Sequence, residues 1–304
     1  MADRRWVFVA GMHRSGTTLL GDILGAHPDV ARLVGTGRLE EEGQHVQHML
    51  PRGLDLGGTT RWALNSDAHM TEDDVVDADV LREHLESSWE PYWSKPADVV
   101  VEKSPPTVGR MRLMQHLWPE ARFIVMTRHP LVQALSVQKW NRTYPISLST
   151  LGAGFAGTLE NWFAGADMLA EDAPHVRHLL VLRYEHLIDD PAGQLARVAD
   201  FVGLEGGLDA TMVEPARNSV YEAFVEGQLA RSMRAYPDLF ARRKSATTGV
   251  KGAIRRGSWA VTSRAWAATG RLPRLCRRYE ERSLEHGYDI TSLRTARPFE
   301  AARI

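Results

Sequence analysis

The sequence predicts an α/β fold in which a central parallel sheet is flanked by helices. Four short apolar runs have the length and composition of buried strands. They are Trp6–Ala10, Asp98–Val101, Arg122–Thr127 and His178–Tyr184. A helical pattern follows each run, and strands that alternate with helices form βαβ units with parallel strands.

The predicted helices extend the alternation to the end of the chain. They span about Thr17–Ala26, Pro106–Leu117, Pro130–Arg142, Phe155–Glu171, Pro191–Val202 and Trp259–Thr269. A chain of 304 residues has room for one large domain or two smaller ones, and we find no internal repeat or obvious linker. We expect one domain over residues 1–304, with a substrate-side insertion at about 35–98 and a distinct C-terminal segment at about 231–304.

The charges are balanced in total but not along the chain. The 37 Lys and Arg against 38 Asp and Glu give a formal net charge of −1, which argues against a wholly basic nucleic-acid binder and an acidic disordered protein. Residues 37–98 carry 14 acidic and 5 basic side chains, or −9, and residues 231–282 carry 14 basic and 3 acidic ones, or +11. The insertion is therefore acidic and the C-terminal segment basic.

Cysteine content and hydropathy restrict the location of the protein. Cys276 is the only cysteine, so neither an intrachain disulfide nor a cysteine-based zinc site can form. The run Trp6–Ala10 is too short for a signal sequence or a membrane span. We expect a cytoplasmic protein without a transmembrane segment. The 32 Arg against 5 Lys are typical of a GC-rich bacterial genome.

A glycine-bounded loop joins the first strand to the first helix. Its residues are Gly11-Met12-His13-Arg14-Ser15-Gly16-Thr17-Thr18. Such a loop directs backbone N–H groups and a helix N-terminus toward an anion. The spacing is that of G-x-x-x-x-G, but Thr17 stands where nucleoside triphosphatases have lysine. The loop therefore predicts a site for phosphate or sulfate, and the alternative is an ordinary turn with a Ser/Thr cap.

The loop sequence carries a resemblance to a known family. Arg14-Ser15-Gly16-Thr17-Thr18 resembles the 5′-phosphosulfate loop of sulfotransferases that use 3′-phosphoadenosine 5′-phosphosulfate (PAPS). Gly25-Ala26-His27-Pro28-Asp29-Val30 is similar to the carbohydrate and tyrosylprotein branch. The resemblance implies a P-loop-like three-layer fold, PAPS as donor, and donor contacts from Arg14, Ser15, Gly16, Thr17 and Thr18.

A second block follows the strand Arg122–Thr127. Arg128-His129-Pro130 begins the next helix, and Ser136 lies about two turns into it. An arginine at the carboxyl edge of a parallel sheet can grip a phosphate with two N–H groups. Arg128 and Ser136 resemble the family's 3′-phosphate motif. The alternative is a surface arginine before a helix-starting proline.

A third block contains a candidate adenine contact. Val181–Leu187 with Asp190-Pro191 resembles a family block in which a tyrosine, here Tyr184, lies near the adenine. The alternative is a tyrosine that only covers a buried strand. With this block the resemblance extends in order over residues 7–204.

Sulfuryl transfer needs cations around the migrating group and a base for the acceptor proton, as phosphoryl transfer does. The leaving group is already a good one, so we expect no metal. Arg14 is one candidate cation. Lys103 ends a predicted strand, and the resemblance places a lysine there beside the transferred sulfate. The alternative is a solvated strand-end lysine.

The base is chosen from a short run of carboxylates. The tyrosylprotein branch has a glutamate soon after His-Pro-Asp, but Val34 occupies the ungapped position here. Glu40, Glu41, Glu42 and His45 are the candidates, with His48 as a further alternative. We select Glu42 because Glu-Gly-Gln-His resembles a motif of bacterial members with the same extension. Adjacent carboxylates can raise one another's pKa, although three glutamates in a row are also typical of a solvated face.

Lys251 and Arg255 resemble the family's late nucleotide-covering loop only weakly.

The family resemblance over the three blocks implies that this protein moves a sulfuryl group from PAPS to a hydroxyl of a sugar, lipid or secondary metabolite, releasing 3′-phosphoadenosine 5′-phosphate (PAP). We expect a small-molecule acceptor and no nucleic-acid partner. The alternatives are a small-molecule kinase with an aberrant P-loop and a non-catalytic nucleotide-binding protein whose basic segment engages an anionic surface.

Overall fold

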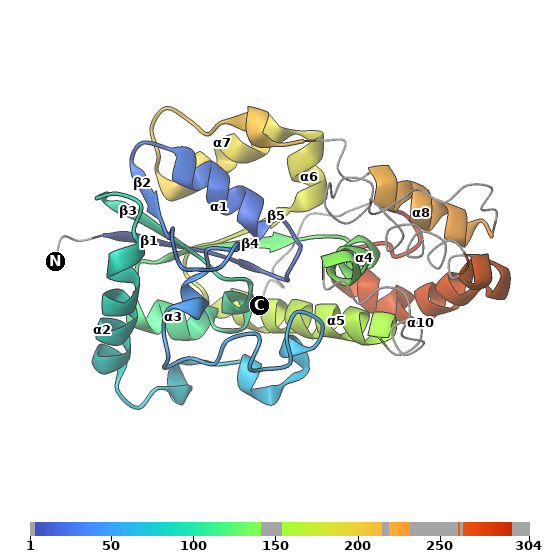
Figure 1. Ribbon diagram of the computed structural model, residues 1–304, viewed down its shortest axis with the longest axis horizontal. Coiled ribbons are helices and arrows are strands. Elements are labelled where there is room, and N and C mark those ends of the chain that lie inside the picture. The colour runs from blue at the N-terminus through green and yellow to red at the C-terminus, as the bar shows by residue number, and fades with distance from the viewer. Residues whose placement is uncertain (1–3, 141–153, 215–218, 232–260, 262–263, 294–304) are drawn as a thin grey trace. The chain divides into compact units, whose positions relative to one another are not determined.

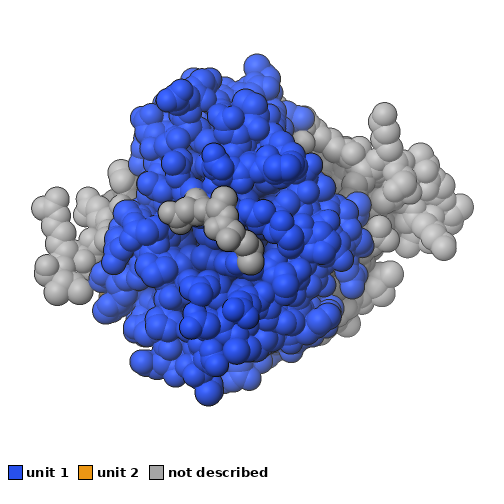
Figure 2. Space-filling model, turned by 90° about the vertical axis from the view of Figure 1, so that its left-hand side faces the viewer, with its two compact units in different colours: residues 1–128, 164–214, 299–304 blue, residues 129–163, 215–298 orange. Residues whose placement is uncertain are grey.

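The computed structural model describes residues 4–140, 154–214, 219–231, 261 and 264–293. Its contacts form two compact units. Unit 1 comprises residues 1–128, 164–214 and 299–304, and unit 2 comprises residues 129–163 and 215–298. Figure 2 shows one face of unit 1. A single domain over the whole chain stays a prediction.

Unit 1 is built on a five-stranded sheet in the order β2-β3-β1-β4-β5 (Figure 1). Every neighbouring pair is parallel, which confirms the predicted parallel sheet. The strands are β1 (Arg5–Gly11), β2 (Val30–Arg32), β3 (Val99–Lys103), β4 (Arg122–Thr127) and β5 (Leu179–Arg183).

Alternating residues of β1 build a core on each side of the sheet, because successive strand side chains point to opposite faces. Val7 and Val9 join Leu20 of α1 (Thr17–Ala26) and Val198 of α7 (Pro191–Val202) in one apolar cluster. Trp6 packs on the other face, with its ring centroid 5.8 Å from that of Trp89 at the end of α2 (Ala78–Trp89). Figure 1 shows α1 and α7 over one face and α2 and α3 (Met111–Leu117) over the other. The predicted three layers are confirmed.

Some elements differ from those that the sequence predicts. The helix expected from Pro106 becomes α-helical only at Met111, because the prolines begin a 3-10 turn over Pro105–Gly109 and lack the N–H groups that an α-helix needs. Neither β2, with three residues, nor α2, inside the polar insertion, was expected. Residues Tyr184–Asp189 form a further short helix, α6.

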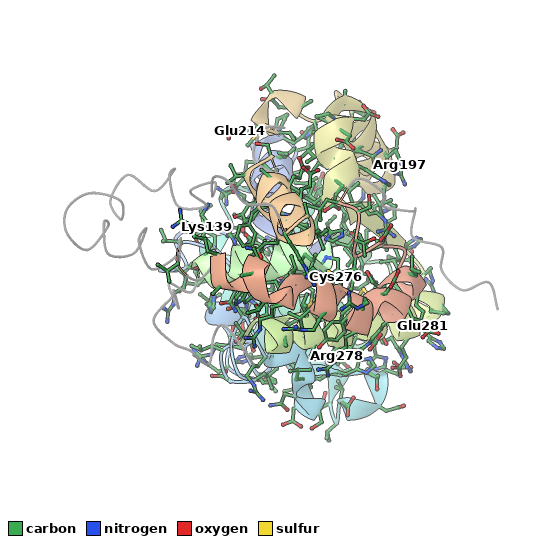
Figure 3. All side chains as sticks on the ribbon, turned by 90° about the vertical axis from the view of Figure 1, so that its right-hand side faces the viewer. Lys139, Arg197, Glu214, Cys276, Arg278 and Glu281 are labelled. Carbon is green, nitrogen blue, oxygen red and sulfur yellow. The ribbon has the colours of Figure 1, made fainter. Side chains whose placement is uncertain are left out.

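Unit 2 contains α4 (Pro130–Trp140), residues 155–163 of α5 (Phe155–Asp172), α8 (Ser219–Leu229) and α10 (Arg271–Glu285). The Tyr279 hydroxyl donates to Glu160 at 2.7 Å, and Arg282 pairs with the same carboxylate at 2.9 Å, fixing α10 to α5. Figure 3 labels Cys276 and Arg278 on α10. Residues 264–269 are helical, within the predicted helix Trp259–Thr269. No helix in the described part of the chain is both long and apolar enough to cross a membrane.

Candidate active site

The β1–α1 loop requires glycine at both of its ends. Gly11 has φ 141° and Gly16 has φ 109°, conformations that side chains with a Cβ rarely adopt. A Cβ on Gly11 would overlap the carbonyl oxygen of Met126, and one on Gly16 would lie 2.7 Å from Cδ2 of Tyr184. The loop therefore packs directly against the end of β4 and the first residue of α6.

Two independent features make this loop suitable for an anion. Gly16 is the N-cap of α1, and no side chain caps the helix, so the first N–H groups lack helical acceptors. The Ser/Thr cap considered as an alternative is therefore wrong. The buried Ser15 hydroxyl has no hydrogen-bond partner among the described residues, and such groups normally find one. A phosphate or sulfate group fits both features.

Arg128 and Tyr184 meet beside the same loop. The Arg128 guanidinium lies 4.2 Å from the centroid of the Tyr184 ring, and its Nη1 donates to the Arg14 carbonyl oxygen at 3.0 Å. Arg128 and Tyr184 are buried, whereas Arg14 is exposed. Unit 1 thus brings together residues of the first, second and third sequence blocks. Ser136 is buried on α4 in unit 2.

Glu42 and Lys103 form a buried ion pair. Lys103 Nζ lies 3.0 Å from Glu42 Oε1, and the two residues are 6% and 3% exposed. Lys103 also donates to the carbonyl oxygen of Glu40 and, at 3.4 Å, to the Thr18 hydroxyl. The lysine therefore links the anion loop to the predicted base. This burial excludes the solvated-surface interpretation for both residues.

The second carboxylate oxygen of Glu42, Oε2, faces the side chains of the residues that follow Glu42 in the chain. It accepts from the Gln44 side chain and lies 3.6 Å from Nε2 of His45. Burial lowers the pKa of His45 below its ordinary value. Glu41 turns elsewhere, since its carboxylate accepts from the Thr36 N–H at 2.8 Å. Of the candidate glutamates, Glu42 is the one whose carboxylate contacts Lys103.

Two titratable residues of this region were missed in the sequence. Glu102 is buried, and burial raises its pKa to about 7. His13 lies in the anion loop, and burial lowers its pKa to about 4. The position of Glu102 beside Lys103 at the strand end was a usable signal. One of its partners, the Gly43 N–H, is 59 residues away in sequence, so local patterns could not reveal that contact.

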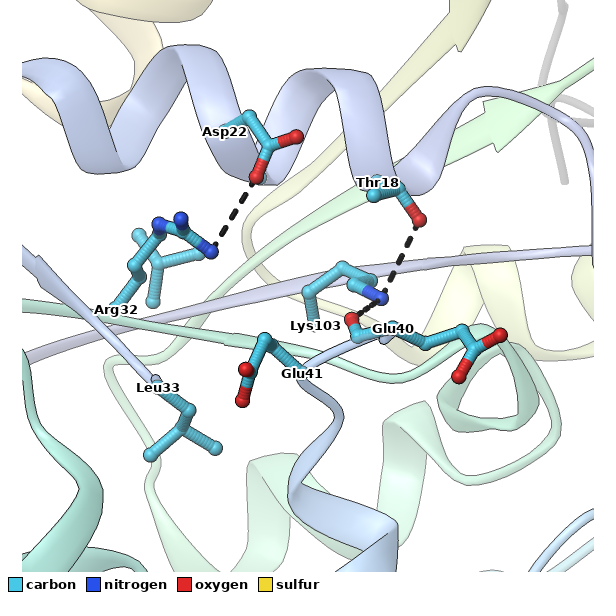
Figure 4. A pocket seen from close by; sticks show the side chains of 9 residues that line it. Thr18, Asp22, Arg32, Leu33, Glu40, Glu41 and Lys103 are labelled. Atoms are coloured by element: carbon cyan, nitrogen blue, oxygen red, sulfur yellow. Dashed lines mark hydrogen bonds and ion pairs between the residues drawn. The ribbon is translucent and has the colours of Figure 1, made fainter. Parts of the chain in front are cut away.

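A small pocket opens beside Lys103 (Figure 4). It is lined by Thr18, Gly21, Asp22, Arg32, Leu33, Glu40, Glu41, Val101 and Lys103. Arg32 pairs with Asp22 at 3.3 Å on its far side. Figure 4 shows the Lys103 ammonium between Thr18 and Glu40. The cation of the buried pair therefore forms part of the pocket wall.

Lys251 and Arg255 lie outside the described residues, so their predicted donor contacts stay predictions. Within the described ranges no group of three or more His, Cys, Asp or Glu side chains could hold a metal ion. The catalytic and donor-binding roles of the other candidates also stay predictions.

Comparisons with known proteins identify relatives of this chain. Nodulation protein NoeE of Sinorhizobium fredii is 27% identical over 217 residues, covering 65% of this chain and 50% of that protein. A putative protein-tyrosine sulfotransferase of Caenorhabditis briggsae is 28% identical over 216 residues, covering 66% and 65%. This chain thus spans half to two thirds of the length of these two curated relatives.

A solved structure and a family profile complete the comparison. The sulfotransferase domain of the Synechococcus PCC 7002 olefin synthase is 17% identical with a TM-score of 0.44, and the match covers 88% of this chain and 96% of that domain. The profile of the sulfotransferase family matches residues 7–208, a range that contains the anion loop, Glu42, Lys103, Arg128 and Tyr184. Because this match extends over well more than half of the chain, the protein belongs to the sulfotransferase family.

Proposed function

We propose that this protein transfers a sulfuryl group from PAPS to a hydroxyl of a small molecule such as a sugar, a lipid or a secondary metabolite. The observation that carries the proposal is the buried Glu42–Lys103 pair, which lies next to an anion loop through the contact of Lys103 with Thr18. A carboxylate base and a cation at one anion site are what sulfuryl transfer to a hydroxyl requires.

Ser15, Thr17, Thr18 and the amides that begin α1 would hold the 5′-phosphosulfate of the donor. The unpartnered Ser15 hydroxyl and the uncapped helix support this assignment. Arg128 and Ser136 would contact the 3′-phosphate, and Tyr184 the adenine, with Lys251 and Arg255 as further predicted contacts. When bound, PAPS supplies an activated sulfuryl group with a good leaving group.

Glu42 would take the proton of the acceptor hydroxyl. As the proton leaves, the acceptor oxygen forms the new bond to sulfur, and the bond from sulfur to the phosphate oxygen of the donor breaks. The products are a sulfate ester and PAP, and the proton ends on Glu42. A protonated Glu42 no longer neutralises Lys103, so its ammonium becomes available to the negative charge on the transferred and leaving oxygens. Arg14, exposed at the loop, would supply a second cation.

The kinase alternative lacks the lysine that a P-loop nucleotide site uses, because Thr17 follows Gly16. The relatives named above include a nodulation protein and a putative protein-tyrosine sulfotransferase, so a protein tyrosine is the acceptor to compare with small molecules.

Incubation with radiolabelled PAPS and a panel of sugars, lipids, phenols and tyrosine peptides tests the proposal. We expect label on a small-molecule hydroxyl, and none when Glu42→Gln replaces the wild type. Transfer from Mg²⁺-ATP instead of PAPS would contradict it.

A further inference from the structure

A second buried carboxyl lies directly behind the Glu42–Lys103 pair. Glu102 precedes Lys103 on β3 and is 2% exposed. Its Oε1 accepts from the Gly43 N–H at 2.9 Å and from the Ser104 hydroxyl at 2.5 Å. Gly43 follows Glu42 in the chain. Two neighbouring residues of β3 therefore hold the Glu42 turn: the Lys103 side chain binds the Glu42 carboxylate, and the Glu102 carboxylate binds the backbone N–H of Gly43.

The backbone after Glu42 is held at two more points. The Ser104 hydroxyl accepts from the Gln44 N–H at 3.2 Å, and Trp89 Nε1 donates to the Gly43 carbonyl oxygen at 3.1 Å. A Cβ on Gly43 would lie 2.7 Å from Glu102 Oε1, so glycine is needed for this approach. The turn is thus clamped by Glu102, Ser104 and Trp89.

We propose that Glu102 is a positioning residue that acts through Gly43 and Ser104 to hold the Glu42 carboxylate beside Lys103. The inference rests on the proposed function, in which Glu42 is the base. Glu102 needs no contact with either substrate in this role. A misplacement of a reacting group by about 1 Å can cost on the order of 100-fold in rate, so a clamp on the base has a kinetic effect.

The charge of Glu102 also acts on Glu42. Burial, with a smaller contribution from the neighbouring Glu42 carboxylate, raises the pKa of Glu102 to about 7, while the hydrogen bonds from Ser104 and Gly43 and the charge of Lys103 oppose the rise. Arg110 lies beyond the turn at the end of β3. Burial lowers its pKa, and the charge of Glu102 opposes that change. Because an ionised carboxylate accepts stronger hydrogen bonds than a neutral one, ionised Glu102 holds the Gly43 N–H and the Ser104 hydroxyl, and with them the Glu42 turn, more firmly. We expect kcat to rise with pH through about 7 as Glu102 ionises.

Three variants separate these effects. Glu102→Gln keeps an acceptor oxygen but removes the charge, Glu102→Ala removes both, and Asp172→Asn neutralises a buried carboxylate that contacts His69 instead. We expect Glu102→Ala to lower kcat about 10-fold to 100-fold. Glu102→Gln should lower it less and abolish the rise near pH 7, and Asp172→Asn should preserve both kcat and the rise. All three should bind PAP within about twofold of the wild type.

If Glu102→Ala does not fold, the pH profile of Glu102→Gln decides the matter. A Glu102→Gln enzyme with wild-type kcat and an unchanged rise near pH 7 would overturn the proposal. Retained transfer with a large loss of PAP affinity would also overturn it, because the residue would then act on donor binding.

A second measurement needs no acceptor and so separates this proposal from the proposed function. In protein labelled with carbon-13 at the glutamate carboxyls and nitrogen-15 at glycine, one carboxyl signal should titrate near pH 7, far from ordinary glutamates. The Gly43 amide should follow it, and both changes should vanish in Glu102→Gln. If these changes are observed but the wild type transfers no sulfuryl group, the proposed function is wrong, while the contact of Glu102 with the Gly43 turn is still confirmed. A titration that persists in Glu102→Gln would refute the assignment to Glu102.

Discussion

Lys103 Nζ and Glu42 Oε1 lie 3.0 Å apart in a buried ion pair that joins residues 61 positions apart in sequence. The pair connects the end of β3 with the acidic insertion. It also fixes the geometry of the site, because the Lys103 ammonium donates a charge-assisted hydrogen bond that orients the Glu42 carboxylate.

Replacement of Glu42 by glutamine should lower kcat by about 100-fold to 10,000-fold, because a general base contributes a factor of that order. PAP affinity should remain within about twofold of the wild type. Steady-state kinetics with an identified acceptor, together with PAP titration, checks both. Glu41→Gln is the matched comparison, since Glu41 bonds the Thr36 amide instead. A larger loss in Glu41→Gln than in Glu42→Gln would move the base to Glu41.

Replacement of Lys103 by methionine should destabilise the protein by about 3–5 kcal/mol, because it leaves a buried carboxylate without its partner. The double variant Lys103→Met with Glu42→Gln should recover much of that loss. Urea denaturation of the two single variants and the double variant measures the coupling. Strictly additive effects of the two changes would show that the pair contributes nothing to stability.

Replacement of Arg128 by lysine should weaken PAP binding about 10-fold or more, because lysine lacks the planar fork that grips phosphate and stacks on a ring. Calorimetric titration measures the change, and kcat should change little. Arg122→Lys, at the opposite end of β4, is the control. Equal PAP affinity in Arg128→Lys and the wild type would remove Arg128 from the donor site.

Replacement of Gly16 by alanine should weaken PAP binding about 10-fold or more, because the added Cβ would collide with Tyr184 and distort the anion loop. Gly58→Ala provides the control, since Gly58 also has positive φ but no atom within 4 Å of its added Cβ. Both variants carry backbone strain of about 1–2 kcal/mol. If the two bind PAP equally well, contact between the loop and Tyr184 does not shape the donor site.

The stability of the wild type should fall relative to His13→Gln as pH decreases from about 6.5 toward 4. The pKa of His13 is lowered from 6.5 to about 4, so the unfolded chain takes up the proton first. The contribution of neutral His13 to the free energy of unfolding is complete above about pH 6.5. It is lost as pH falls, and the free energy of unfolding then decreases by at most about 1.4 kcal/mol per pH unit. Urea denaturation at several pH values tests this, and a constant difference between the two proteins would contradict it.

Local sequence patterns were enough to predict much of the fold. The four predicted strands and the helices that begin at Thr17, Pro130 and Pro191 start within two residues of the predicted positions. The three-residue β2 is too short to show periodicity, and α2 buries only Leu81, Leu85 and Trp89. In both cases tertiary packing, not local pattern, decides the structure.

The candidate site also combines features that local sequence predicts with contacts between residues far apart in the chain. The anion loop lies within one strand–loop–helix segment, so its sequence predicts its shape. The contacts of Glu42 and Glu102 join the insertion to β3 across about 60 residues, and no spacing rule specifies them. Glu42 could be selected only by resemblance to a short motif, and the clamp around Gly43 became visible only in three dimensions.

The most direct test of the account is a calorimetric titration of the wild-type protein with PAP, with Mg²⁺-ATP as the comparison nucleotide. We predict a dissociation constant for PAP below about 100 μM, equivalent to about −5.5 kcal/mol, and weaker binding of Mg²⁺-ATP. Absence of PAP binding at that concentration, or tighter binding of Mg²⁺-ATP, would contradict the assignment of this site to PAPS.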